Sequence, residues 1–227
     1  AASLASKKFN IGQKIILTGN VAGSSDITAK WSVYPAPNSA LATIALMPIQ
    51  ADISKADAIV ATGASVTFGV SGEYFSSGKS YTFRLTATNS QLSTSVSYSE
   101  IVISINTPPV TGTVSVTPSS GTALISKFKA FTTPFSDDDL PVLYKFFYYI
   151  DPNALDIGVL GASFVEKTFV ETSLPQGNKN YGNRVIVGVI GQDSLGARAG
   201  AQTAIEVKSL VLEPIVVVTP AGTPTPA

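Results

Sequence analysis

The stretch Tyr-Thr-Phe-Arg-Leu-Thr-Ala-Thr, residues 81–88, alternates apolar side chains with polar ones along its whole length. Successive side chains of a β-strand point to opposite faces, so this alternation predicts a strand with one buried face. β-Branched and aromatic residues dominate the runs of this kind, and Gly, Ser, Pro and Asn separate them, which is typical of antiparallel strands. The same period of two recurs at Val66, Phe68 and Val70, at Ile101, Ile103 and Ile105, at Val114 and Val116, and at Tyr144, Phe146 and Tyr148. The sequence therefore predicts an all-β protein.

One stretch has the spacing of a helix instead. Ile49, Ile53, Ala56 and Val60 recur at intervals of three or four residues, and Gly63 follows them. A helix places such residues on one face and often ends at a glycine, so we expect a single short helix here between strands.

Two prolines mark a boundary near the middle of the 227-residue chain. Asn106-Thr-Pro-Pro follows one run of strands, and proline favours an extended linker because it has no backbone N–H for a strand ladder. The Pro- and Thr-rich residues after 211 cannot pack a core and are typical of a linker or stalk. We expect an immunoglobulin-like or fibronectin type III-like β-sandwich at residues 1–106, a second β-sandwich at 107–211, and a Pro/Thr tail at 212–227.

The two halves resemble each other, as a tandem repeat would. In each half a tyrosine follows a glycine by three or four residues before a long strand: Tyr81 after Gly78, and Tyr181 after Gly177. This spacing fits a tyrosine corner, in which a buried hydroxyl group bonds to upstream backbone. Trp31 is the expected core aromatic of the first sandwich.

The composition excludes several classes of function. The sequence has no His and no Cys, so it offers no His-based triad, thiolate nucleophile, disulfide or zinc finger. Its 15 basic and 15 acidic side chains balance, which argues against binding nucleic acid or an anionic membrane. The longest apolar runs, residues 41–49 and 185–191, are shorter than the ~18–20 residues of a membrane-spanning helix, so we expect no direct membrane insertion.

Catalysis is not expected either. A pair of carboxylates across a cleft is the enzyme chemistry that this composition still allows. The spacing of the acidic residues in the second half does not distinguish them from exposed strand and loop residues; they are Asp151, Asp156, Glu166 and Glu171. We expect no catalytic residue and no organic cofactor.

Ser136-Asp137-Asp138-Asp139 is the one cluster of charge. Ca²⁺ takes roughly six to eight oxygen ligands, and clustered Asp side chains are a usual source. Neighbouring side chains of an extended segment point apart, so three consecutive carboxylates cannot all face one ion. Asp137 and Asp139 are therefore candidate Ca²⁺ ligands that would stiffen a hinge between domains. The alternative is a turn in which Asp side chains accept backbone N–H bonds.

Aromatic side chains occupy both faces of one predicted strand, residues 144–149. Tyr144, Phe146 and Tyr148 are expected to pack inward. Phe147 and Tyr149 would then face solvent, a neighbouring domain or a ligand, and exposed aromatics can mark an interaction surface. The alternative is burial under a long loop or against the other sandwich.

Several motifs stand in a fixed order in the second half: Asn106-Thr-Pro-Pro, Val-Ser-Val-Thr-Pro-Ser-Ser-Gly-Thr-Ala-Leu at 114–124, Phe-Ser-Asp-Asp-Asp-Leu-Pro-Val-Leu-Tyr-Lys-Phe at 135–146, and Gln-Asp-Ser-Leu-Gly-Ala at 192–197. This run resembles the REJ (receptor for egg jelly) module of polycystin-family ectodomains. Residues 80–88 are similar to a strand of the same family and of fibronectin type III and PKD domains. Members of the family usually carry cysteines, and a tryptophan where Phe135 stands here.

The resemblance implies a segment of a large surface protein of cilia, gametes or epithelia, often anchored through a channel-like membrane region. We therefore expect a non-enzymatic extracellular segment of a larger cell-surface or ciliary protein. It would act in adhesion, recognition or mechanical coupling, with proteins or glycans at the cell surface as partners. The alternative is a carbohydrate- or protein-binding pair of β-sandwiches from a secreted or cell-wall protein.

Overall fold

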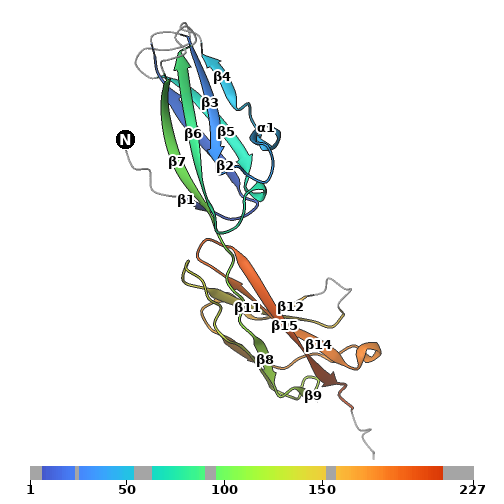
Figure 1. The fold of residues 1–227 in the computed structure, drawn as a ribbon. Coiled ribbons are helices and arrows are strands. Elements are labelled where there is room, and N and C mark those ends of the chain that lie inside the picture. Colours follow the sequence, from blue (N-terminus) through green and yellow to red (C-terminus); the bar gives the residue numbers. More distant parts are fainter. Residues whose placement is uncertain (1–6, 24–25, 54–62, 90–95, 152–156, 212–227) are drawn as a thin grey trace, which may run out of the picture. The chain divides into compact units, whose positions relative to one another are not determined.

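A computed structural model describes residues 7–23, 26–53, 63–89, 96–151 and 157–211 of the chain (Figure 1). Strands dominate, as the alternating sequence predicts, and they belong to two compact units. The first unit comprises residues 1–110 with segments 136–142 and 192–199; the second comprises 111–135, 143–191 and 200–227. Within the described residues, no helix has the length and apolar character needed to cross a membrane.

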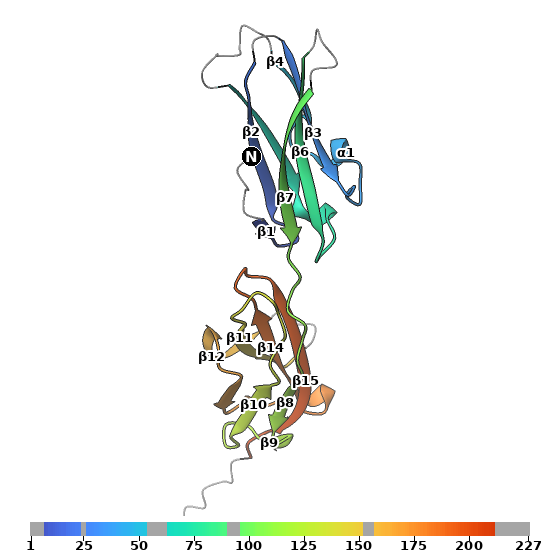
Figure 2. The same cartoon turned by 60° about the vertical axis from the view of Figure 1, so that its left-hand side comes forward.

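The first unit is built on two sheets. The larger has the strand order β1-β7-β6-β3-β4, and the smaller pairs β2 with β5. Figures 1 and 2 show β2 and β5 in a separate layer from β3, β6 and β7. The strands are β1 (Lys7–Phe9), β2 (Lys14–Val21), β3 (Ile27–Tyr34), β4 (Gln50–Ile53), β5 (Ala64–Ser71), β6 (Ser80–Asn89) and β7 (Val96–Ile105), with a 3-10 turn, η1 (Gly72–Tyr74), after β5.

Alternate residues from the facing strands fill the space between these sheets. Phe68 of β5 and Phe83 of β6 are both fully buried, and their ring centroids lie 6.0 Å apart. Trp31 of β3 has 4% of its surface exposed and its ring lies 5.8 Å from that of Phe68. The prediction that Trp31 is a core aromatic is confirmed.

The predicted helix at residues 49–60 is wrong where the structure describes it. Gln50–Ile53 forms strand β4, which pairs antiparallel with residues 27–30 of β3. This pairing gives the backbone of residues 50–53 its hydrogen-bond partners and buries Ile53. The helical spacing depended mainly on Ala56 and Val60, further along the chain. Residues 54–62, where Ala56 and Val60 lie, are outside the described residues. Among the described residues, the one α-helix is α1 (Leu41–Ile44), a single turn.

The second unit also contains two sheets, a three-stranded one in the order β13-β10-β8 and a five-stranded one in the order β12-β11-β14-β15-β9. Val185, Val187 and Val189 of β14 are fully buried, because β14 lies between two neighbours and presents alternate residues to the core. The strands are β8 (Val114–Thr117), β9 (Ser120–Thr122), β10 (Phe128–Thr132), β11 (Leu143–Tyr149), β12 (Gly158–Val165), β13 (Phe169–Thr172), β14 (Arg184–Gln192) and β15 (Arg198–Lys208), with a 3-10 turn, η2 (Lys179–Tyr181), before β14.

The two units share one order of strands, which is what a tandem repeat predicts. The larger sheet reads β1-β7-β6-β3-β4 in the first unit and β9-β15-β14-β11-β12 in the second. In each, a three-residue strand at one edge runs parallel to the long last strand: Lys7 lies opposite Ile103, and Ser120 lies opposite Glu206. The fold is therefore two immunoglobulin- or fibronectin-type β-sandwiches in tandem, as the alternating sequence predicts. The predicted tail at 212–227 lies outside the described residues, and the domain bounds stay predictions.

The predicted tyrosine corner is confirmed in the first unit and wrong in the second. Tyr81 is buried, and its hydroxyl oxygen accepts a hydrogen bond of 2.9 Å from the backbone N–H of Ser76. Tyr181 is 46% exposed at the end of η2, because Gly182 and Asn183, both at positive φ, turn the chain before β14 begins. In the second unit the hydroxyl group of Tyr144 accepts the backbone N–H of Phe135 at 2.9 Å instead.

Candidate metal centre

The three Asp residues in the loop between β10 and β11 differ in their exposure to solvent. Asp138 is exposed, whereas Asp137 and Asp139 are half-buried. The Oδ1 atom of Asp137 accepts the backbone N–H of Asp139 at 2.7 Å, so the predicted Asp turn is present. Ser136 at the start of the loop pairs with Val110 through two backbone hydrogen bonds of 2.9 and 3.1 Å. The alternation leaves Asp137 and Asp139 as the pair that can share a ligand.

Asp193 joins this pair from the loop between β14 and β15. One carboxylate oxygen each from Asp137, Asp139 and Asp193 lie within 4.8 Å of one another. The backbone links the two loops, because the N–H of Ser194 donates to the carbonyl oxygen of Asp139 at 3.0 Å. Three oxygens this close can supply part of the roughly six to eight oxygen ligands that a hard cation such as Ca²⁺ takes.

Asp193 is held rigidly for a carboxylate. Only 2% of its surface is exposed, and its Oδ1 atom accepts the backbone N–H groups of Leu195 and Ala197 at 2.9 and 2.8 Å. Its Oδ2 atom accepts the side-chain amide of Asn106 at 2.6 Å. Asp193 lies in the family motif at residues 192–197 and was not among the predicted ligands. The available signal was an Asp two residues after the apolar run at 185–191, where a buried strand ends.

Lys8, within β1, and Asn10, just after this strand, complete the surroundings. The amide nitrogen of Asn106 also donates to Asn10 Oδ1 at 2.8 Å, and Asn10 donates to the carbonyl oxygen of Leu195 at 2.7 Å. The Lys8 ammonium group forms an ion pair with Asp139. All of these residues belong to the first unit, since segments 136–142 and 192–199 are part of it.

The predicted interaction residues Phe147 and Tyr149 lie together on one face of β11. Both are half-buried, and their rings stack with centroids 6.4 Å apart at an angle of 11°. The Tyr149 hydroxyl donates to Gln202 of β15 at 2.8 Å, and Phe147 packs over Gly188 of β14. Tyr144 and Phe146 are buried on the opposite face, as predicted, whereas Tyr148 is half-buried. An interaction surface at Phe147 and Tyr149 stays a prediction.

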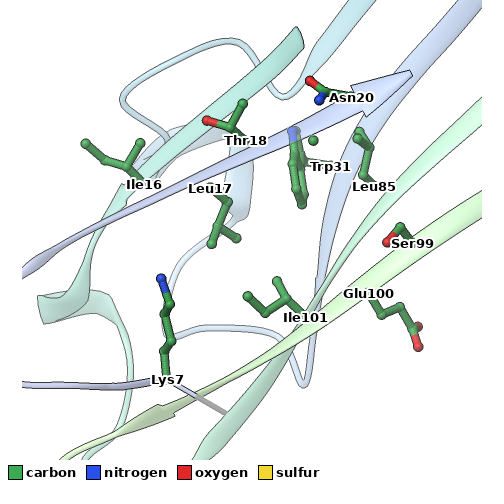
Figure 3. Close-up of a pocket in the computed structure, with 11 residues that line it drawn as sticks. Lys7, Ile16, Leu17, Thr18, Asn20, Trp31, Leu85, Ser99, Glu100 and Ile101 are labelled. Atoms are coloured by element: carbon green, nitrogen blue, oxygen red, sulfur yellow. The ribbon is translucent and has the colours of Figure 1, made fainter. Parts of the chain in front are cut away.

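A cavity of about 260 Å³ opens in the first unit between β2 and β7 (Figure 3). Leu17 lines it from β2 and Trp31 from β3, and the indole N–H of Trp31 is buried without a hydrogen-bond partner among the described residues. Its charged lining residues are Lys7 and Glu100, which have opposite signs. This cavity therefore holds no pair of acids for hydrolysis.

The acidic residues of the second half that could serve in hydrolysis are exposed or have partners where the structure describes them. Glu166 and Glu171 are exposed, and Glu171 lies 3.9 Å from the ammonium group of Lys129. Asp151 also has a partner, and Asp156 lies outside the described residues.

The strand order and cores define a protein of the immunoglobulin and fibronectin β-sandwich class. The chain belongs to the REJ domain family, whose model matches residues 6–214 and so confirms the resemblance seen in the sequence. A comparison with curated proteins finds no match.

Several solved structures are similar to this chain at low sequence identity. A Ca²⁺-stabilised adhesin of an Antarctic bacterium is 12% identical, with a TM-score of 0.50 over 90% of this chain and 47% of that one. A 1.5-MDa bacterial ice-binding adhesin is 15% identical, with a TM-score of 0.42 over 89% of this chain and 61% of that one. A marsupial T cell receptor is 10% identical, with a TM-score of 0.43 over 92% of this chain and 73% of that one. The chain thus spans less than two thirds of both adhesin structures, and the similarity concerns the fold alone.

Proposed function

We propose that this chain is an extracellular structural and interaction segment of a larger cell-surface or ciliary protein, similar to the REJ region of polycystins. Its family and its two β-sandwiches support this proposal. The segment carries adhesion or recognition through proteins or glycans at the cell surface and transmits force between the parts that flank it. No bond is made or broken in this role.

The observation that carries the mechanical part is the parallel pairing of edge strands in both units. In the first unit, β1 runs parallel to β7, which is the last strand of that unit along the chain. In the second unit, β9 runs parallel to β15, which is likewise the last strand. When the two ends of a unit are pulled apart, force acts along such a pair and loads all of its hydrogen bonds together. An antiparallel hairpin pulled at its open end loses its bonds one at a time. Parallel pairing of an early edge strand with the last strand of each sandwich therefore resists extension.

Single-molecule pulling on the two ends of the chain tests this role. We expect two separate unfolding steps, one for each unit, each requiring a clear rise in force. Ala123→Pro removes the backbone N–H that donates to the carbonyl oxygen of Lys208 at 2.9 Å beside the β9–β15 pair. This variant is expected to lower the unfolding force of the second unit. The unfolding force of the first unit should stay unchanged and serves as an internal control. Extension of the unmodified chain without resisted steps would contradict a mechanical role.

The location of the segment is tested on cells that express the whole parent protein. An antibody raised against residues 7–211 is expected to label intact, non-permeabilised cells. Labelling that requires permeabilisation of the plasma membrane would place the segment on the wrong side for adhesion. An antibody against a cytoplasmic protein is the control for membrane integrity.

A further inference from the structure

Asn106 has an unusual environment for a buried amide. Only 1% of its surface is exposed, yet its Oδ1 atom has no hydrogen-bond partner among the described residues. Its amide nitrogen donates to two oxygen atoms, Asp193 Oδ2 at 2.6 Å and Asn10 Oδ1 at 2.8 Å. These two acceptors set the orientation of the amide and leave Oδ1 as the unpartnered end. A buried acceptor without a partner costs stability, so native proteins usually give such an atom a water molecule or an ion as partner.

The unpartnered oxygen belongs to an amide group that contacts the carboxylate cluster. Oδ1 and Nδ2 of Asn106 are bonded to the same carbon atom, and Nδ2 contacts Asp193 directly. Asp193 is in turn one of the three carboxylates whose oxygens lie within 4.8 Å of one another. The amide of Asn106 thus adjoins the three carboxylates of Asp137, Asp139 and Asp193, and the four side chains come from three separate segments.

The charges of this cluster do not balance. It holds three carboxylates, and the one ion pair that these acids form within the described residues is between Asp139 and Lys8. Three negative charges against one positive charge leave two negative charges, on partly or fully buried groups. Uncompensated buried charge is costly unless it is paired or bound to a metal ion. A divalent cation would neutralise the remaining charge.

The chemistry of the donors selects among divalent cations. All four side chains offer oxygen, and the chain has no His or Cys to favour zinc or copper. Ca²⁺ accepts irregular sets of carboxylate and amide oxygens, whereas Mg²⁺ demands a near-ideal octahedron and keeps several waters. Oxygens that come from separate loops and a linker suit the more tolerant ion.

We propose that Asp137, Asp139 and Asp193, together with the side-chain oxygen of Asn106, bind one Ca²⁺ ion. Lys8 competes with the ion for Asp139, because its ammonium group pairs with that carboxylate in the absence of metal. This site goes beyond the proposed function, since it concerns ion binding by the first unit and not the role of the parent protein. Extracellular modules bind Ca²⁺ with dissociation constants of about 10⁻⁴–10⁻³ M, and we expect an affinity in this range.

Calorimetric titration of the full chain with CaCl₂, after treatment with a chelator, tests the site. Binding of one ion per chain is the expected result, with Asp137→Asn and Asp193→Asn each weakening it about tenfold or more because each removes one ligand charge. Asp138→Asn is the matched control: it makes the same change in charge one residue away, on an exposed side chain, and should leave the affinity nearly unchanged. Equal weakening by Asp138→Asn would indicate general attraction by negative charge and would overturn the site. Absence of binding to the unmodified chain at millimolar Ca²⁺ would also overturn it.

Two further variants separate the roles of Asn106 and Lys8. Asn106→Leu keeps a similar side-chain size without the amide oxygen and is expected to weaken Ca²⁺ binding. Lys8→Met removes the competing ammonium group and is expected to strengthen it. Fluorescence of the single Trp31, which lies in the core of the same unit, reports whether each variant is folded in the presence of chelator. A folded Asn106→Leu variant with unchanged affinity would remove Asn106 from the ligand set, and a folded Lys8→Met variant with weaker binding would refute competition.

Discussion

Phe128→Ala is expected to lower the free energy of unfolding of the second unit by about 3–5 kcal/mol. Phe128 lies in β10 with 1% of its surface exposed, and β10 is the central strand of the three-stranded sheet. Removing its ring takes away buried apolar surface and leaves a cavity that the neighbouring strands can fill only in part. Urea denaturation followed by far-ultraviolet circular dichroism measures the loss.

The same strand supplies the control for this prediction. Phe131 lies three residues further along β10 with 39% of its surface exposed, so Phe131→Ala removes the same atoms from a more solvent-exposed position. We expect this variant to lose clearly less stability than Phe128→Ala. Equal losses at the two positions would mean that burial in β10 does not decide the stability of this unit.

Phe83→Ala is expected to have an effect of similar size, about 3–5 kcal/mol, in the first unit. Phe83 is fully buried, and its ring centroid lies 6.0 Å from that of Phe68 and 5.7 Å from that of Phe75. Phe83 is the central member of a row of aromatic rings, which has the order Trp31, Phe68, Phe83, Phe75 and Tyr81. Each such pair contributes about 0.5–1.5 kcal/mol beyond the area that it buries, so two pairs are lost with one ring.

Fluorescence of Trp31 follows this unfolding directly, because it is the one tryptophan of the chain and lies in the same row. Tyr98→Ala on the paired strand β7 is the control, since Tyr98 is 62% exposed and contacts Arg84 only from the outer face. A transition of the Phe83→Ala variant that coincides with that of the unmodified chain would show that the aromatic row does not hold the two sheets together.

Two tyrosines with similar local sequence show where the residue pattern predicts the fold correctly and where it does not. Tyr81 and Tyr181 have nearly the same spacing from a glycine, but only Tyr81 is buried. The difference comes from Gly182 and Asn183, whose positive φ angles close a turn and expose Tyr181 before β14 starts. The residue pattern did not show this, because glycine and asparagine permit that conformation without requiring it.

Sequence patterns alone predict most of the strands, most of their buried faces and the family, because alternation along a strand and the order of motifs are properties of neighbouring residues. Trp31 and Phe83 could be assigned to buried positions on that basis. Only the tertiary structure brought Asp193 and Asn106 to Asp137 and Asp139. Those residues come from two loops and a linker that are far apart along the chain, and they meet because the order of strands places β14 between β11 and β15. A pattern read within one segment contains no record of that order.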